Sequence, residues 1–444
     1  MAKVEQFPDQ SGENTNDHKN MPDDSLLIGS GSADTPGPED FGDPDPEAPD
    51  LPRKRREREP DDGLSYAEKI RRHRIRVRVT WAVAILLILS AVILTAAFMS
   101  NRHFSRAEII PVREFAAEEG AVCKNFDGNI LQYGPNGATC ADTNGRIKWS
   151  ITYEMDQPIL SMSGNVAAIA DYGGRTIYVM NTSKQLCSIK TSLPIHKISA
   201  SESGEVAAIL DDANSTWIQL YSRTGDEIAY FVRSMEENGY PMDVAVSANG
   251  SVVCVSSLMM KDASVKSVLS FYNFGKAGKD YPQHKVVDFE YDNEVFPCVR
   301  FMGDKVCTAA SDSRFVVFDT SGVEPKNSIN NMLTENLQGI FYSDKYIGLL
   351  FTDLTREYLY RLDIYGKSGK KEGSVGFSMV FDDLQIAGNR IYINNAQAMQ
   401  IYALDGREIF NGGFDRMVKT LIPSSGPGGL YAVSENEIDE IKLR

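Results

Sequence analysis

Few residues in this chain have the types and spacings that bind a metal ion. Beyond residue 100 there are three histidines, His103, His196 and His284, and none belongs to a His-x-x-x-His or Cys-x-x-Cys pattern typical of zinc sites. The run Asp142-Thr143-Asn144-Gly145 resembles the start of a calcium loop, but no glutamate stands at the twelfth position of that loop. We interpret this run as a turn that uses Asn-Gly for positive φ, and we expect no bound metal.

The sequence offers equally little for catalysis. Gly366-Lys367-Ser368 resembles part of a phosphate-binding loop, but the upstream glycine is missing and the run lies in a turn between strands. Acidic pairs occur at Asp211-Asp212 and Asp382-Asp383, and neighbours on a strand point to opposite faces, so neither is a catalytic pair. No Gly-x-Ser-x-Gly elbow leads into a helix. We expect a protein that is not an enzyme, with no catalytic or cofactor-binding residues.

All cysteines lie after residue 100, and they are Cys123, Cys140, Cys187, Cys254, Cys298 and Cys307. An even number in an exported domain permits disulfides. Cys140, Cys254 and Cys307 lie in apolar runs, where a free cysteine behaves as a small core residue, so free thiols are the favoured interpretation. The alternative is a disulfide, and Cys298 with Cys307 is then the best pair because a hairpin turn at Gly303-Asp304 separates them.

Charge is unevenly distributed along the 444 residues, whose net charge is −15. Residues 1–51 contain 13 acidic and two basic residues, residues 52–78 contain five acidic and 11 basic residues, and residues 79–444 therefore carry −10. An acidic main domain repels phosphate backbones, so we expect no nucleic acid partner. Nine of the 19 prolines lie in residues 1–60, where apolar residues are scarce, and we predict that residues 1–63 form a disordered acidic tail.

An apolar stretch from Trp81 to Met99 predicts one transmembrane helix. It contains no charged residue, and the segment 79–100 is long enough to span a hydrocarbon core of about 30 Å. A buried globular helix or a cleaved signal peptide would be the alternatives, and the length of the run and its distance from the N-terminus argue against both. Ser65-Tyr66-Ala67-Glu68 fits a capping box, which predicts a basic juxtamembrane helix over residues 64–78.

The basic residues beside this stretch predict its orientation. Lys69, Arg71, Arg72, Arg74, Arg76 and Arg78 precede it, whereas the following segment has fewer basic residues. Positive charge stays in the cytoplasm, so we expect a cell membrane protein with the N-terminus inside and the C-terminal domain outside. Arg53-Lys54-Arg55-Arg56 could be a nuclear signal, but beside a membrane helix we favour contact of this basic flank with anionic lipid.

The remaining residues, 107–444, contain a repeat. A short β-rich run followed by a polar turn recurs with turn positions at 142, 181, 222, 273, 319, 363, 405 and 444, which are 39 to 51 residues apart. Strand-rich repeats of this length are typical of propeller blades, whereas a sandwich of unrelated strands would not be periodic. We therefore predict an all-β, eight-bladed β-propeller, with seven blades as the alternative.

One repeat illustrates the expected blade. Its four strands are predicted at Pro158 to Ser163, Asn165 to Asp171, Arg175 to Asn181 and Gln185 to Lys190. The second strand is almost entirely small and apolar, as expected for a strand covered on both faces by neighbouring blades. The corresponding second strands are predicted at Glu205 to Asp211, Ser251 to Ser257, Lys305 to Ala310, Tyr346 to Phe351, Arg390 to Asn394 and Gly429 to Ser434.

The last repeat is short of one strand. It stops at Arg444 after its third strand, and the extended apolar segment Ile109 to Phe115 has no other partner. We predict that residues 109–115 pair with Glu437 to Leu443, which joins the last blade to the first and covers an exposed edge.

The repeated turn, as in Ile401-Tyr402-Ala403-Leu404-Asp405-Gly406, resembles the repeats of quinoprotein-like propellers. The layout of tail, basic segment, single anchor and propeller over residues 65–444 is similar to the family of unknown function DUF5711 of Gram-positive clostridial bacteria. That resemblance implies a bacterial cell-surface location and transfers no functional residues. A quinone dehydrogenase would need stacking tryptophans, and Trp149 and Trp217 lie at unrelated places in their blades, so we expect no quinone cofactor.

Three functions remain open on the sequence alone. The favoured one is a non-catalytic binding or scaffold module for an unknown protein or cell-wall ligand, anchored in lipid through Trp81 to Met99. The alternatives are an enzyme with an unrecognised site in the propeller channel and a transmembrane sensor that relays to the cytoplasmic tail.

Overall fold

The computed structural model describes residues 66–100, 103–115, 120–212, 215–234, 239–261, 264–424 and 429–444. The predicted disordered tail, residues 1–63, lies outside the described residues. The predicted segments 64–78 and 79–100 fall, from Tyr66 onward, within one helix.

Helix α1 (Tyr66–Ser100) runs without a break for 35 residues and contains no glycine or proline. Within Ile70–Val92, a window of 18 residues has a mean hydropathy of 2.0 and is long and apolar enough to cross a membrane. The hydroxyl groups of Thr80, Ser90 and Thr95 donate to backbone carbonyls about one turn earlier, at 2.8 to 2.9 Å. These hydroxyls are therefore satisfied within the helix and do not need water.

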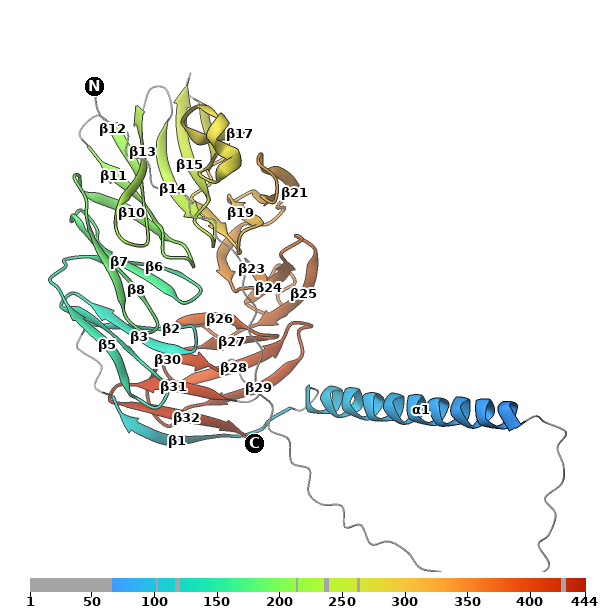
Figure 1. The fold of residues 1–444 in the computed structure, drawn as a ribbon. Helices are drawn as coiled ribbons and strands as arrows, with labels where there is room; N and C mark the ends of the chain where they lie inside the picture. The colour runs from blue at the N-terminus through green and yellow to red at the C-terminus, as the bar shows by residue number, and fades with distance from the viewer. Residues whose placement is uncertain are drawn as a thin grey trace, which may run out of the picture. The chain divides into compact units, whose positions relative to one another are not determined.

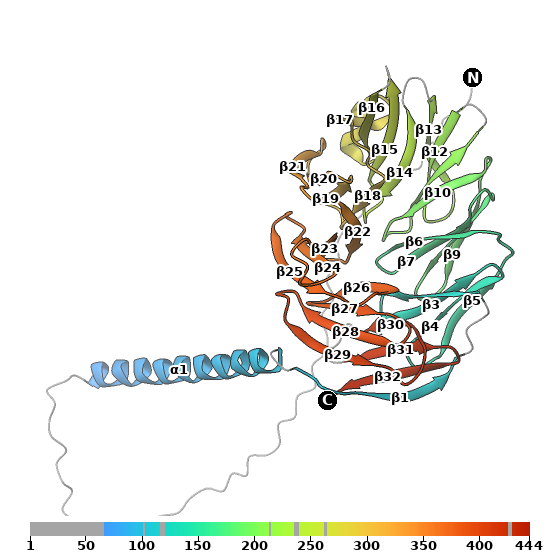
Figure 2. The same ribbon diagram turned by 180° about the vertical axis from the view of Figure 1, so that it is seen from behind.

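Eight four-stranded antiparallel sheets follow, arranged around a common centre as the blades of a propeller (Figures 1 and 2). The predicted eight blades are confirmed, and the seven-bladed alternative is wrong. Blades 1 to 4 contain β2 (Val122–Phe126), β3 (Asn129–Gly134), β4 (Gly137–Ala141), β5 (Ile147–Thr152); β6 (Pro158–Ser163), β7 (Val166–Asp171), β8 (Thr176–Asn181), β9 (Gln185–Lys190); β10 (Ile195–Ala200), β11 (Val206–Asp211), β12 (Ser215–Tyr221), β13 (Glu227–Ser234); and β14 (Tyr240–Val246), β15 (Val252–Lys261), β16 (Ser264–Asn273), β17 (Lys285–Asp292). Blades 5 to 8 contain β18 (Cys298–Phe301), β19 (Val306–Ala310), β20 (Arg314–Asp319), β21 (Lys326–Met332); β22 (Leu337–Tyr342), β23 (Tyr346–Thr352), β24 (Tyr360–Gly366), β25 (Lys371–Phe377); β26 (Asp383–Ala387), β27 (Arg390–Asn394), β28 (Ala398–Ala403), β29 (Glu408–Gly413); and β30 (Val418–Pro423), β31 (Leu430–Ser434), β32 (Glu437–Leu443) with β1 (Ala107–Glu114).

Blade 8 takes its fourth strand from the start of the domain. β1 pairs antiparallel with β32, with Ala107 opposite Leu443 and Ile109 opposite Ile441 (Figure 1). The predicted pairing of residues 109–115 with Glu437 to Leu443 is confirmed, although the strand begins at Ala107 and ends at Glu114. This pairing joins the last blade to the first segment of the propeller and covers the outer edge of β32.

The second strand of each blade carries the core. In β7, Val166, Ala168 and Ala170 pack into a cluster with blade 3, whereas Ala167 and Ile169 pack with blade 1. Alternate residues of a strand point to opposite faces, so a strand between two blades must be apolar at every position. The prediction from its small apolar residues is confirmed.

The repeated turn has a physical reason. At Asp405-Gly406 the turn between β28 and β29 requires φ of +91° at the glycine, and a Cβ there would lie 2.6 Å from the carbonyl oxygen of Ser374 in the neighbouring blade. Both constraints select glycine at this position.

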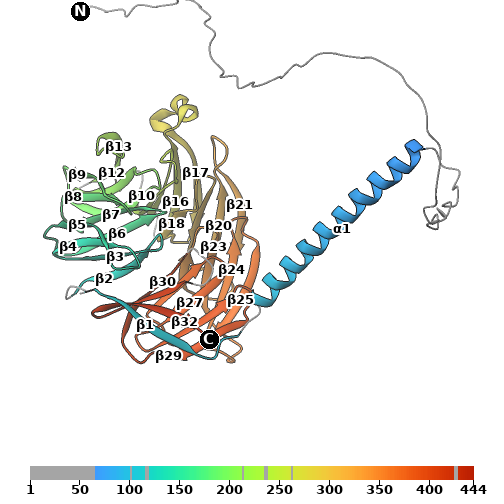
Figure 3. The same cartoon turned by 60° about the horizontal axis from the view of Figure 1, so that its bottom comes forward.

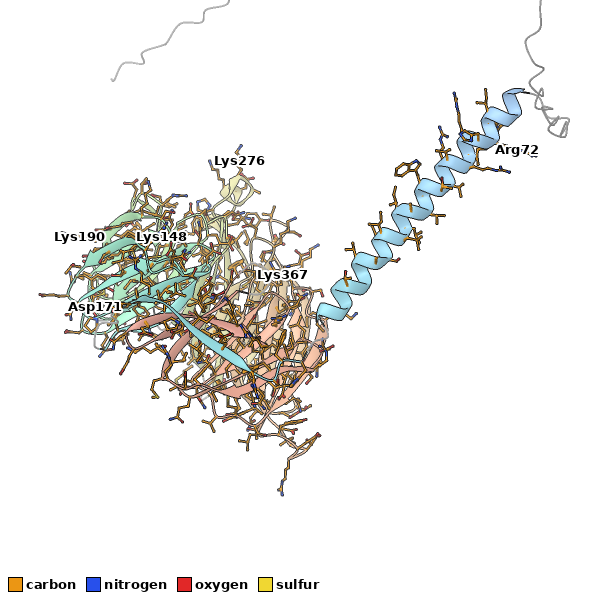
Figure 4. The ribbon with its side chains drawn as sticks, turned by 90° about the horizontal axis from the view of Figure 1, so that it is seen from below. Arg72, Lys148, Asp171, Lys190, Lys276 and Lys367 are labelled. Carbon is orange, nitrogen blue, oxygen red and sulfur yellow. The ribbon has the colours of Figure 1, made fainter. Side chains whose placement is uncertain are left out.

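Blade 4 departs from the repeat. Its strands β15 and β16 are ten residues long, and two 3₁₀ helices, η1 (Lys276–Asp280) and η2 (Pro282–His284), lie between β16 and β17 (Figure 3). Lys276, labelled in Figure 4, belongs to η1. The long β15 and β16 contribute to the longest repeat spacing, from 222 to 273, whereas η1 and η2 lengthen the next one, from 273 to 319.

The ring of blades has two distinct ends. Because neighbouring strands are antiparallel, the turns after the first and third strands of a blade lie at one end and the turn after the second strand lies at the other. We call the first end the hairpin face, and the second, where one blade connects to the next, the connection face.

Candidate functional site

A cavity of about 120 Å³ lies on the hairpin face, where four blades converge. Ser343 and six other polar or charged residues line it, and we call these six the central cluster: Ser163, Glu202, Arg300, Tyr342, Asp344 and Lys367. Ser163 comes from blade 2, Glu202 from blade 3 and Arg300 from blade 5, while the other three residues belong to blade 6. Lys367 is labelled in Figure 4, in the turn between β24 and β25.

Backbone hydrogen bonds between neighbouring hairpin turns position this cluster. The amide of Ser203 in blade 3 donates to the carbonyl of Ala248 in blade 4 at 2.9 Å, and the amide of Ala248 donates to the carbonyl of Gly303 in blade 5 at 3.3 Å. The amide of Asn249 donates to Oδ1 of Asp304 at 2.7 Å. Three successive turns are therefore fixed to one another, which holds the loops around Glu202 and Arg300 in place.

Arg300 connects blades that are not neighbours in the ring. Its Nη2 donates to the carbonyl of Met162 in blade 2 at 3.2 Å. Its Cζ also lies 5.2 Å from the centroid of the Tyr342 ring, within the range of a cation–π interaction. Much of the guanidinium is therefore engaged within the protein.

The carboxylate of Glu202 lies near other carboxylates. Burial raises its pKa, and the neighbouring carboxylates of Asp344 and Asp304 raise the pKa further, while the ammonium of Lys367 opposes them. Gly164 allows this approach, because a Cβ on Gly164 would lie 2.9 Å from Cγ of Glu202. A positive ligand group near Glu202 would relieve the repulsion among these acids.

Tyr342 closes one side of the cavity. Its hydroxyl lies 3.4 Å from Oγ1 of Thr308 and 4.0 Å from Sγ of Cys298. Burial raises the pKa of Tyr342 well above its usual value, so the phenol stays protonated at neutral pH. The ring therefore offers a neutral, aromatic wall beside the charged residues.

The cluster has the chemistry of a polar recognition site. The described residues that line it include no histidine or cysteine. Its carboxylates accept hydrogen bonds, its cations donate them, and its hydroxyls can do both. Glu202 and Asp344, with Asp304 close by, outnumber the two cations, one of which is engaged by Met162 and Tyr342. This arrangement suits a ligand that presents a positive charge.

The connection face brings together two residues that the sequence analysis considered separately. Nδ1 of His196 lies 3.2 Å from Oδ2 of Asp211. The rings of Tyr172 and Tyr240 lie 5.5 and 5.7 Å from the His196 ring, between centroids. Burial and the carboxylate of Asp211 raise the pKa of Tyr240. Asp212 lies in the turn after β11, where its amide donates to the carbonyl of Ser215 at 3.0 Å.

The other histidines and the second acidic pair are dispersed. Nε2 of His103 lies 3.6 Å from Oε1 of Glu408, and Nδ1 of His284 lies 3.2 Å from the carbonyl of Asn273. Oδ2 of Asp382 accepts from the amide of Ala396 at 3.1 Å, whereas Oδ1 of Asp383 lies 3.6 Å from Nζ of Lys124. The structure brings none of these residues to the central cluster.

The remaining motifs occupy turns and packing positions. Oδ1 of Asp142 accepts from the amides of Asn144 and Arg146 at 2.9 Å, so the Asp142 run is a turn as interpreted. Gly366-Lys367-Ser368 lies in the turn between β24 and β25, also as interpreted, although Lys367 reaches the cavity. Trp149 is on the outer strand β5 and Trp217 on the third strand β12, which are different places in their blades.

All six cysteines are free. The alternative pair was wrong, because the register of β18 and β19 places Cys298 opposite Ala310 and Cys307 opposite Phe301. Cys307 instead shares a buried cluster with Cys254 of blade 4. Burial and the neighbouring Cys307 thiol raise the pKa of Cys254 well above its usual value.

Sequence reasoning missed the central cluster. Its residues are spread from Ser163 to Lys367, so no local spacing joins them. One signal was available: Glu202, Asp304 and Asp344 occupy equivalent turns after the first strands of blades 3, 5 and 6. Aligning the repeats would have placed these acids at one end of the ring.

Comparison with known proteins places the chain in a family. Residues 100–443 match the family described as "Family of unknown function (DUF5711)". No curated protein matches the chain.

Several solved structures are similar in fold. BamB from Moraxella catarrhalis is 11% identical, with a TM-score of 0.46 over 76% of this chain and 100% of that chain. Raptor from Chaetomium thermophilum is 9% identical, with a TM-score of 0.41 over 77% of this chain and 29% of that chain. The Pan2 WD40 domain from Neurospora crassa is 10% identical, with a TM-score of 0.38 over 65% of this chain and 89% of that chain. The family match covers more than half of the sequence, and the chain belongs to the DUF5711 family.

Proposed function

We propose that this protein is a membrane-anchored, extracytoplasmic propeller that acts as a non-catalytic binding module for a protein or cell-envelope ligand. Helix α1 would be the anchor, with the N-terminus in the cytoplasm. The uncharged run from Trp81 to Met99 and the basic residues before Trp81 support this arrangement.

The crowded carboxylate of Glu202 is the observation that carries the binding proposal. It lines a cavity with Asp344, close to Asp304, and burial and these acids together raise its pKa. Such a site favours a ligand with a positive group, such as the ammonium of a lysine side chain or another amine. Tyr342 would pack against the apolar part of that group.

The test is photo-crosslinking in intact cells that express the full chain. A photoreactive residue replaces Ser343, which lines the cavity, and in a separate chain it replaces Asp312 in the turn between β19 and β20 on the connection face. We expect a discrete adduct from position 343 and none of the same mass from position 312. Equal adducts from both positions would count against a site at the cavity.

Charge variants test the kind of ligand. Glu202→Gln with Asp344→Asn removes two negative charges, and it should abolish most of the adduct at position 343. Lys367→Met removes a positive charge from the same cavity and should preserve or increase the adduct. If the adduct is instead lost in Lys367→Met and kept in the double variant, the site prefers an anion and the proposed ligand class is wrong.

A further inference from the structure

The N-terminal part of α1 carries basic residues that have no countercharge beside them. Residues 69–78 contain six basic residues and no acidic one. Residues three or four positions apart lie on the same side of a helix, so five arginines of this stretch form two rows along α1. These arginine rows consist of Arg71, Arg74 and Arg78 on one side and Arg72 and Arg76 on the other. All five are exposed, and no carboxylate of a described residue lies within 4.0 Å of their guanidinium groups.

Anionic lipid can reach only part of the arginine rows. If α1 enters a membrane at Trp81, a rise of about 1.5 Å per residue puts Arg78 roughly 5 Å and Arg71 roughly 15 Å from the hydrocarbon core. The headgroup layer is roughly 5 to 8 Å thick, and the attraction of charged lipid falls off within a Debye length beyond it. Arg71, Arg72 and Arg74 therefore lie outside the headgroup layer and are available to another anion.

The same chain contains a matching anion. Residues 34–50 contain seven acidic residues, five prolines and no basic residue. Residues 52–65 contain five basic and four acidic residues, so they leave the charge of residues 34–50 largely uncompensated. An extended, proline-rich chain rises about 3.1 Å per residue, so Asp43, Asp45 and Glu47 would follow one another at about 6 Å. Arginines four positions apart on a helix are also about 6 Å apart along its axis.

Chain length allows the two parts to meet. The 15 residues from 51 to 65 can extend to about 50 Å, whereas residues 69–78 cover only about 15 Å of the helix axis. Because both parts belong to one chain, the effective concentration of the acidic residues at the arginine rows is on the order of millimolar. A single exposed ion pair contributes little, so the contact depends on several pairs that form together.

We propose that the acidic residues of 34–50 bind the arginine rows at Arg71, Arg72 and Arg74, as an intramolecular partner that competes with anionic lipid. This contact goes beyond the function proposed for the propeller and involves a different part of the chain. It would cover these arginines and limit their binding to other anions. Salt screens charges that are exposed to water, so high ionic strength should release the arginine rows.

Photo-crosslinking of the purified full chain in nanodiscs of zwitterionic lipid tests the contact. A photoreactive phenylalanine analogue replaces Phe41, which lies among the acidic residues, and mass spectrometry measures its adducts on residues 66–80. Replacement of Arg71, Arg72 and Arg74 together by glutamine should lower the yield several-fold. The matched control replaces Arg53, Lys54 and Arg55 by glutamine, which removes the same charge closer to residue 41 and should leave the yield unchanged. Both faces of a nanodisc are open, so the result does not depend on the orientation of α1.

Charge reversal separates this pairing from chance encounters within one chain. Asp43→Lys with Asp45→Lys should lower the yield, and adding Arg71→Glu with Arg72→Glu should restore it. In nanodiscs of anionic lipid the yield should fall but stay above that of the glutamine variant of α1. Equal yields from the natural chain and that variant would overturn the proposal. Loss of every adduct on anionic lipid, or adducts only between two chains, would overturn it as well, because lipid or a second copy would then be the partner.

Discussion

Arg300 on β18 donates a hydrogen bond from Nη2 to the carbonyl of Met162 on β6, at 3.2 Å. These residues belong to blades 5 and 2, which are separated around the ring by blades 3 and 4. The contact therefore connects two blades that are not neighbours in the ring directly at the cavity. The same guanidinium packs on Tyr342, so one side chain links three blades.

Replacement of Arg300 should loosen this connection. We expect Arg300→Ala to lower the free energy of unfolding by about 1 kcal/mol, since it removes one charge-assisted hydrogen bond and one cation–π contact at an accessible site. The change is measured by urea unfolding of a fragment that begins at residue 103, with tryptophan fluorescence as the signal. Arg175→Ala, which removes a bond to Ser192 within one blade, is the control for loss of an arginine. Equal effects of both variants would contradict a special role for the cross-ring contact.

The raised pKa of Glu202 predicts a pH-dependent effect of its replacement. A carboxyl whose pKa is higher in the folded state binds protons more tightly there, so the stability of the natural protein falls as pH rises above about 4.5. Glu202→Gln removes this penalty. We expect the variant to be more stable at pH 7, by less than about 1 kcal/mol because solvent screens the site, and equally stable near pH 3.5.

Thermal unfolding of both chains at these two pH values checks the sign. Asp312→Asn removes an acid from the connection face and serves as the control, with no gain expected at pH 7. A loss of stability in Glu202→Gln at pH 7 would show that the carboxylate is held by favourable contacts instead.

Removal of β1 should destabilise the whole propeller. Fragments that begin at residue 103 and at residue 115 differ by the strand that covers β32, and the shorter one exposes an edge and apolar surface. We expect a loss of several kcal/mol, measured as a shift in the urea midpoint. Identical midpoints would mean that β1 contributes nothing to closure.

The cysteines should differ in reactivity. Burial raises the pKa of Cys123 and of Cys140 to about 11, so at pH 8 only about one thiol in a thousand is ionised. Cys187 and Cys298 are only half-buried and should react with iodoacetamide before the four buried cysteines. Mass spectrometry of the labelled protein over time gives the order, and unfolding in urea should make all six react. Early labelling of Cys140 would contradict the burial of its thiol.

The orientation proposed for α1 can be tested with protease. Added to intact cells or protoplasts, protease should degrade the propeller and leave an N-terminal tag protected, because the basic residues before Trp81 stay in the cytoplasm. Detergent permeabilisation is the control, and it should expose the tag. Loss of the tag from intact cells would reverse the orientation.

The blades were predictable because the same pattern, a short β-rich run followed by a polar turn, recurs in each of them. Asp405-Gly406 and the equivalent polar turns follow the third strands of the blades, and these turns have a recognisable residue pattern. The closing strand was predictable because residues 109–115 are apolar and had no partner. Its start at Ala107 was not predictable. Ala107 and Glu108 pair with β32 through their backbone, and their residue types do not indicate this pairing.

The central cluster could not be derived from spacing. Arg300 and Met162 are 138 residues apart, and their meeting depends on the curvature of a closed ring. Lys367 was correctly placed in a turn, but its reach into the cavity depends on which end of blade 6 that turn occupies. Likewise, His196 and Asp211 were considered separately, and only the pairing of β10 with β11 brings them to 3.2 Å.

The pairing of β1 with β32 also determines a waiting time during synthesis. β1 leaves the ribosome roughly 330 residues before β32, and at about 5 to 20 residues per second it waits roughly 15 to 65 s for its partner. Throughout that interval its edge is open to neighbouring nascent chains. Pro111 and the charged residues Glu108 and Arg113 would limit wrong pairing in that period. The strand that closes the finished ring is thus the one that must remain unattached longest while the ring is made.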